Sequence, residues 1–134
     1  MPELADAVRN AVHGLPVRVV WVFGSVARGE AGSNSDVDLA VLPDHGPVDR
    51  LALRLQLQTA MNQAGFSRVD VVLVDEVPLR LQARIAAEGQ ALVSRDEPVR
   101  VAWTSRVFRE HADFALLQDE LDREMLRAHG DGRR

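Results

Sequence analysis

The sequence contains no cysteine and no lysine, and each absence narrows the chemistry open to the chain. Without cysteine there is no disulfide, no thiolate nucleophile and no zinc site built on sulfur. Without lysine the strongly basic residues are all arginines, which favour bidentate contacts with phosphate or carboxylate groups. Genomic base composition also produces a preference for arginine over lysine. The lack of any apolar run near the ~18 residues that cross a bilayer predicts a soluble protein.

Positive charge is outnumbered by negative charge, with 16 arginines against 20 aspartates and glutamates. The formal net charge of −4 argues against electrostatic binding along a nucleic-acid backbone, because such binding needs many basic side chains to replace counterions. No direct nucleic-acid binding is therefore expected. A small phosphate-bearing ligand held by a few local groups is easier to accommodate. Residues 1–9 lack the basic start and apolar stretch of a secretory signal, so we expect a cytoplasmic protein without membrane contact.

The length of 134 residues and the apolar share of 46% suit one compact domain. Apolar residues recur at helical spacing in four segments, which are residues 3–13, 48–64, 78–89 and the region after Pro98. Short β-branched and apolar runs predict buried strands, which are residues 17–23, 36–42 and 68–74, with a short edge strand over residues 91–93. The alternation of helices with buried strands predicts an α/β domain.

The first predicted strand ends abruptly at Gly24-Ser25, and a loop rich in small and polar residues follows over residues 25–35. A glycine there permits a turn and a close approach that a side chain would block. The Ser25 hydroxyl can cap the following turn or donate to a phosphate oxygen, and free amides of a helical turn would face the same ligand. Arg28 lies in this loop and could clamp a triphosphate.

The second predicted strand begins with Asp36-Val37-Asp38. Because side chains alternate along a strand, both carboxylates point to one face, with Cα atoms ~6.6 Å apart. Oxygen-rich ligands of this kind select magnesium or manganese, and two such ions can drive an in-line phosphoryl displacement. Asp70 is the candidate for a further carboxylate, because it interrupts the apolar third strand at a position where an uncompensated charge is costly.

Each of these features is common on its own. A Gly-Ser turn follows many strands, an Asp-x-Asp pair is often a solvated strand edge, and Arg28 could be an ordinary surface charge. Their combination within one stretch, as strand, Gly-Ser turn, polar loop and Asp-x-Asp strand, is what carries the interpretation.

The run Val22-Phe23-Gly24-Ser25-Val26-Ala27-Arg28-Gly29-Glu30, followed by Ser33-Asn34-Ser35-Asp36-Val37-Asp38-Leu39, resembles the signature of the DNA polymerase β-like nucleotidyltransferases. Within that superfamily the chain most resembles the minimal nucleotidyltransferases. The resemblance implies a small mixed sheet with flanking helices, in an α/β (α+β) fold. It extends over residues 1–93 as a catalytic core, and residues 98–128 would form a C-terminal helical extension of the same domain, 1–134.

The activity implied by the resemblance is a magnesium-dependent transfer of AMP from ATP to a hydroxyl, with release of pyrophosphate. The resemblance also implies that Gly24 and Ser25 hold the triphosphate. It implies that two Mg²⁺ ions, or Mn²⁺ in their place, are bound by Asp36, Asp38 and Asp70. The spacing before the third carboxylate varies in the family. Asp75 and Glu76 are therefore nearby rivals of Asp70, although we place both outside the strand.

The small size resembles that of minimal nucleotidyltransferases paired with a HEPN-domain protein, in which the HEPN partner is an RNase toxin and the nucleotidyltransferase its antitoxin. In such pairs the acceptor is a tyrosine hydroxyl of the toxin. This sequence has no tyrosine, so the partner must supply such an acceptor. Apolar residues after Pro98 could form a partner-binding face, or could simply be core; they include Trp103, Phe108, Phe114 and Leu117.

Two alternatives stay open. The same chemistry could direct AMP to a small molecule of the aminoglycoside type, although relatives of that kind generally carry an added helical domain for the acceptor. A non-catalytic antitoxin could instead neutralise its partner by binding alone. A polymer-directed polymerase is the least favoured reading, because the chain is acidic and has no separate template-binding domain.

Overall fold

The computed structural model describes residues 2–24, 27 and 36–132, with side chains described between residues 3 and 127 of these ranges. The elements follow the order α1 (Pro2–Ala11), β1 (Val17–Phe23), β2 (Val37–Pro43), α2 (Arg50–Gln63), β3 (Val69–Leu73), α3 (Leu79–Glu88), β4 (Gln90–Ser94) and α4 (Glu97–Gly132). Strand β1 has the predicted bounds, and the other elements begin and end within a few residues of the predicted positions.

The four strands form one mixed sheet in the order β3-β2-β1-β4. Strand β1 pairs antiparallel with both β2 and β4, whereas β2 and β3 run parallel. The parallel pair is connected through α2, as a parallel pairing requires a crossover. This mixed sheet with flanking helices confirms the predicted fold class.

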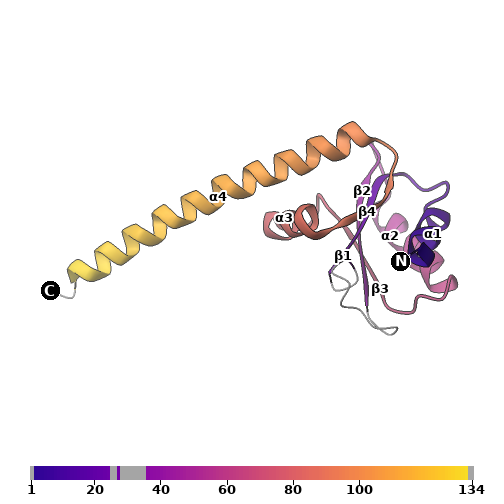
Figure 1. Cartoon of the computed structure of the whole chain (residues 1–134), viewed down its shortest axis with the longest axis horizontal. Coiled ribbons are helices and arrows are strands. Elements are labelled where there is room, and N and C mark those ends of the chain that lie inside the picture. The colour runs from indigo at the N-terminus through magenta and orange to yellow at the C-terminus, as the bar shows by residue number, and fades with distance from the viewer. Residues whose placement is uncertain (1, 25–26, 28–35, 133–134) are drawn as a thin grey trace.

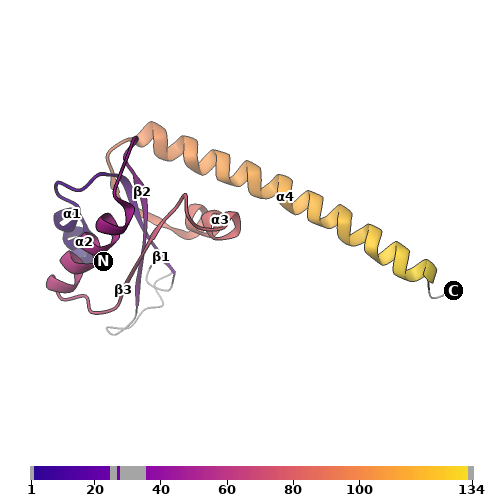
Figure 2. The same ribbon diagram turned by 180° about the vertical axis from the view of Figure 1, so that it is seen from behind.

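Helices cover both faces of the sheet (Figures 1 and 2). Alternate side chains of each strand point to opposite faces, so each strand contributes to two apolar layers. Val22, Leu39 and Leu73 pack in the layer that contains α1 and α2. Trp21 and Ala40 pack in the layer that contains α3 and the start of α4.

The centre of the second layer is a contact between two tryptophans. The ring centroids of Trp21 in β1 and Trp103 in α4 are 4.8 Å apart, and the ring planes are tilted by 39°. Trp103 and Val107 are buried with Ile85 of α3, so the first turns of α4 belong to the core. The prediction that residues after Pro98 form either core or a partner face is therefore resolved for Trp103 in favour of the core.

Polar side chains fix where α4 leaves the sheet. The side chain of Asp96 accepts a hydrogen bond from the amide of Val99 at 3.2 Å, which caps the helix start. The preceding Arg95 donates to the carbonyl oxygens of Val12 and Leu15, at 2.8 and 2.9 Å. Because these carbonyls end α1 and lead into β1, Arg95 ties the junction of β4 and α4 to the opposite layer.

Beyond its first turns, α4 extends away from the domain, and both views show its distal half with no other described element beside it (Figures 1 and 2). Residues 112–127 are all exposed. Phe114 and Leu117 are therefore surface residues, with 56% and 54% of their area accessible. Among the described residues, no helix is long and apolar enough to span a membrane.

Replacing Trp103 with alanine should lower the free energy of unfolding by ~3–5 kcal/mol, because the change removes a ring buried against Trp21. Phe108→Ala is the matched control, since this aromatic residue of the same helix is 44% exposed and should cost less than ~1 kcal/mol. Urea unfolding followed by circular dichroism measures both. Equal losses in the two variants would contradict the assignment of Trp103 to the core.

Candidate active site

The sheet brings three motif positions to one edge. Because β1 is antiparallel to β2, the end of β1 lies beside the start of β2, and Phe23 pairs with Asp38. Because β3 is parallel to β2, its start lies at the same edge, and Asp70 pairs with Asp38. Directly opposed residues point to the same face, so Asp38 and Asp70 project together from neighbouring strands. Gly24 follows Phe23 on the other side of Asp38.

The turn at Gly24 lies against the Asp38 carboxylate. Gly24 has a φ of +75°, in the region that glycine adopts without strain. A Cβ atom placed on Gly24 would lie 2.5 Å from Oδ2 of Asp38, too close for any side chain to fit without displacing the carboxylate. The sequence-based reason for a glycine here, a close approach, thus corresponds to a specific contact.

The environment of Asp38 is unfavourable for its negative charge. Partial burial raises the pKa of the Asp38 carboxyl above its usual value of 3.8, and the charges of Asp70 and Asp36 raise it further. Arg84 of α3 acts in the opposite direction and lowers this pKa, though with less weight. Like charges that converge in this way, with oxygen donors, fit the chemistry of a hard divalent cation such as Mg²⁺.

Asp36 and Asp70 are more exposed than Asp38. Asp36 was expected to open the second strand, but it lies just before β2, which starts at Val37. One Asp36 oxygen, Oδ1, is 3.9 Å from Nη1 of Arg68. Within the ranges that the structure describes, no three histidine, aspartate or glutamate side chains are arranged closely enough to hold a metal ion. The structure therefore pairs Asp38 with Asp70 across β2 and β3, whereas Asp36 lies just before β2 and acts on Asp38 through its charge.

Two predicted phosphate-binding residues, Ser25 and Arg28, lie outside the described residues. Ala27 is the described part of their loop, and its carbonyl oxygen accepts a hydrogen bond from Nε2 of Gln90 at 3.2 Å. Gln90 and the Arg84 mentioned above were not singled out from the sequence. They come from β4 and α3, more than forty residues after the motif, and neither stands in a recognisable pattern.

The rivals of Asp70 lie at the other end of β3. Asp75 accepts two hydrogen bonds of 2.6 Å from Arg50, one on each oxygen. The hydrogen bonds from Arg50 hold the pKa of the Asp75 carboxyl below its usual value. Glu76 is 3.8 Å from Arg54, so both carboxylates are engaged with arginines of α2. Both rivals therefore contact arginines of α2, whereas Asp70 lies opposite Asp38.

Comparison with known families agrees with this geometry. The model of the polymerase beta nucleotidyltransferase family matches residues 9–98, which is more than half of the chain. The chain therefore belongs to this family and carries a nucleotidyltransferase domain, which confirms the resemblance seen in the motif. No curated protein sequence matches the chain significantly.

Among solved structures, the chain is similar to one from a toxin-antitoxin crystal structure with AMP-PNP, with 21% identity, a TM-score of 0.73, and coverage of 90% of this chain and 98% of that one. It is similar to a chain of the MntA-HepT toxin-antitoxin complex, with 20% identity, a TM-score of 0.69 and coverage of 93% and 99%. A third is a complex of tri-AMPylated Shewanella oneidensis HEPN toxin with MNT antitoxin, with 20% identity, a TM-score of 0.63 and coverage of 92% and 94%. At these identities the likeness concerns the fold.

Gly24→Ala should cost ~1–3 kcal/mol of stability and lower nucleotidyl transfer by up to ~10²-fold, because the new methyl group strains the backbone and displaces Asp38. Gly14→Ala provides the control: its φ of +77° imposes a similar backbone cost, but nothing lies within 4 Å of the added Cβ. Thermal unfolding and transfer assays measure the pair. A Gly24 variant as active as the Gly14 variant would contradict the close contact.

Asp38→Asn should raise the free energy of unfolding at pH 7. The native pKa of Asp38 is raised above 3.8, so the native state binds this proton more tightly than the unfolded state does. The resulting penalty is absent below the unfolded pKa, grows as the pH rises through the native pKa, and is fully present at neutral pH. Removing the charge removes the penalty.

Urea unfolding from pH 3 to pH 8 in the absence of divalent cations tests this expectation. The gain from Asp38→Asn should appear only as the pH rises. Asp75→Asn should behave oppositely and lose stability at neutral pH, because Arg50 lowers the pKa of Asp75. A stability difference for Asp38→Asn that does not change with pH would contradict the electrostatic account.

Proposed function

We propose that this protein transfers AMP from ATP to a hydroxyl group of a HEPN-domain RNase toxin and thereby acts as its antitoxin, a protein adenylyltransferase. The observation that carries the proposal is the packing of the Gly24 turn against Asp38, with Asp70 beside it, at one edge of a polymerase β-like sheet. The chain is similar in fold to toxin-antitoxin chains, one with AMP-PNP and one with an AMPylated HEPN toxin. This similarity supports ATP as the donor and a HEPN toxin as the acceptor.

The donor half of the site would be built as follows. Gly24 and Ser25 would bind the triphosphate, and Arg28 would add a positive charge for its phosphate groups. Asp36, Asp38 and Asp70 would hold two Mg²⁺ ions, or Mn²⁺ in their place. When bound, these cations polarise the α-phosphate and favour the ionised form of the attacking hydroxyl. Cation binding also relieves the repulsion that raises the pKa of the Asp38 carboxyl.

The transfer itself makes one bond and breaks one. The acceptor oxygen bonds to the α-phosphorus of ATP, the bond between this phosphorus and the bridging oxygen breaks, and pyrophosphate leaves. The hydroxyl proton passes to the carboxylate of Asp70, which is exposed at the edge where an acceptor approaches. The proposed acceptor is a tyrosine hydroxyl of the partner, which must supply it because this chain contains no tyrosine.

The test is a transfer assay with the HEPN protein encoded by the adjacent gene, Mg²⁺ and ATP labelled at the α-phosphate. Label should move to the HEPN protein, and its RNase activity should fall. Label at the γ-phosphate should not move, which separates nucleotidyl from phosphoryl transfer. EDTA and Asp38→Asn should each lower the rate by ~10²-fold or more, since both remove charge stabilisation from the reacting phosphate. No transfer by a chain that still binds ATP would overturn the proposal.

A second candidate function is neutralisation by binding alone, and the exposed distal half of α4 favours it. The double variant Asp36→Asn with Asp38→Asn separates the two functions, because it removes carboxylates from the proposed site without touching α4. Protection of cells by this variant would favour binding. Loss of protection, with the complex still formed, would favour catalysis.

A further inference from the structure

The apolar face that anchors α4 in the core continues past the edge of the domain. Trp103 and Val107 are buried, and Phe114, Leu117 and Leu121 follow at steps of seven, three and four residues. This spacing keeps them on the face of the helix that Trp103 and Val107 occupy. We call Phe114, Leu117 and Leu121 the distal stripe.

The distal stripe is exposed to an extent that needs an explanation. The accessible fractions are 56% for Phe114, 54% for Leu117 and 48% for Leu121. Helical segments without tertiary packing are only marginally stable in water, and most of their stability in proteins comes from burying an apolar face. Phe114 still lines a cavity with Leu79 at the start of α3. Beyond Phe114 no described element lies beside the stripe, so another apolar surface would stabilise this part of the helix.

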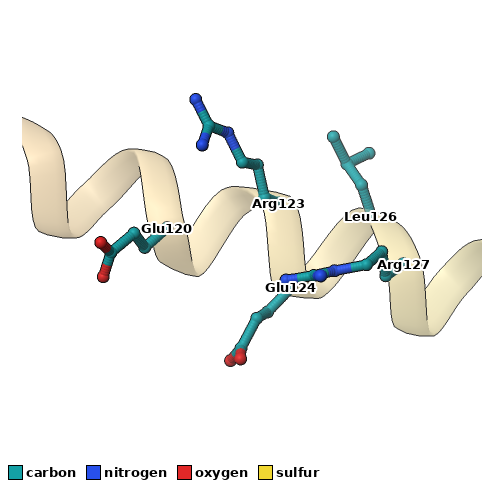
Figure 3. Close-up of a pocket in the computed structure, with 5 residues that line it drawn as sticks. All are labelled: Glu120, Arg123, Glu124, Leu126 and Arg127. Carbon is teal, nitrogen blue, oxygen red and sulfur yellow. The ribbon is translucent and has the colours of Figure 1, made fainter.

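The charges beside the distal stripe indicate what that surface carries. By helical periodicity, Asp113, Glu120 and Glu124 lie along one side of the stripe, and Asp122 lies along the other. Figure 3 shows this part of α4, where Glu120 and Glu124 point to one side and Arg123 points to the other. The five side chains labelled in Figure 3 all belong to this one helix. Of the two arginines in this segment, Arg123 lies opposite the stripe. Arg127 lies beside Glu120 and Glu124, and the flanks of the stripe keep an excess of acidic side chains.

We propose that the distal stripe is the docking surface for a helix of the partner protein, and that this helix carries an apolar stripe flanked by lysine or arginine. Opposite charges across the rim of an interface guide association and fix the register of the two helices. The identity of the partner rests on the proposed function, but the docking surface does not depend on AMP transfer.

A second copy of this chain is a poorer occupant. Two copies paired through Leu117 and Leu121 would place the acidic flanks of one helix beside those of the other, and like charges at such positions are destabilising. Sedimentation of the chain alone should therefore show a monomer. A dimer that Leu117→Ala with Leu121→Ala dissociates would overturn the proposal in favour of self-association.

The adjacent leucines of α4 provide a matched control for binding. Leu117→Ala with Leu121→Ala should weaken the complex with the HEPN protein by ~30-fold or more, as expected for buried interface anchors. Leu116→Ala with Leu126→Ala removes leucines that are 64% and 72% exposed on other sides of the same helix, and it should change the affinity by less than ~3-fold. Alanine keeps the helix propensity high, so the helix is retained in both variants. Equal effects of the two pairs would overturn the proposal.

Charge is tested separately. Glu120→Lys should weaken the complex and reduce its sensitivity to salt, because it removes an attraction at the rim. Asp44→Lys makes the same change in net charge in the exposed loop after β2, and it should leave the affinity unchanged. Tighter binding by Glu120→Lys would show that the partner surface is not basic.

A probe of defined chemistry separates this inference from the proposed function. Two synthetic helical peptides share one leucine stripe, flanked by lysine in the first and by glutamate in the second. The lysine peptide should bind the chain, should fail to bind Leu117→Ala with Leu121→Ala, and should slow amide exchange in residues 112–127. Binding of this kind without any AMP transfer would sustain the docking surface while the enzymatic proposal fails. Preference for the glutamate peptide would overturn the docking surface, whatever the transfer assay shows.

Discussion

The parallel pairing of β2 with β3 is the constraint on which the site depends, because it places Asp70 directly beside Asp38. Antiparallel pairing with β1 then brings Gly24 to the other side of Asp38, where only a glycine leaves room for the carboxylate. The sheet order therefore positions both the turn and the carboxylates. Two packed helical layers hold that order, one with α1 and α2 and one with α3 and the start of α4.

The same arrangement works against stability. Burial and two neighbouring carboxylates raise the pKa of Asp38, and Arg84 offsets this only in part. The fold keeps an unfavourable negative charge at the edge of its sheet, as expected where a cation is to be bound. Asp75 shows the contrast, because Arg50 holds both of its oxygens and lowers its pKa. The charge of Asp75 therefore stabilises the fold, whereas the charge of Asp38 opposes it.

Sequence patterns predicted the strands and helices, because apolar residues repeat with the period of each element. The motif, with its Gly-Ser turn and its Asp-x-Asp strand, predicted that Gly24 and the aspartates belong to one site. The position of Asp36 just before β2 was missed, because strand boundaries depend on pairing with residues such as Arg68 that lie far along the chain. Arg84 and Gln90 were missed because tertiary structure alone brings them near the motif. The sequence could not show that Trp103 is buried and Phe114 exposed, because both residues follow the same helical period.

Helix α4 connects the core of the domain to the distal stripe through one continuous helix. Trp103 stacks on Trp21 of β1, the strand that leads into Gly24, while Leu121 lies ~27 Å further along the same straight helix, at ~1.5 Å per residue. A partner docked at Leu121, as proposed above, would lie at a fixed distance from the Trp21 contact. Such a helix would fix the distance between the docking point and the site. The acceptor hydroxyl would then be selected by its distance from the docking point as much as by its chemical surroundings.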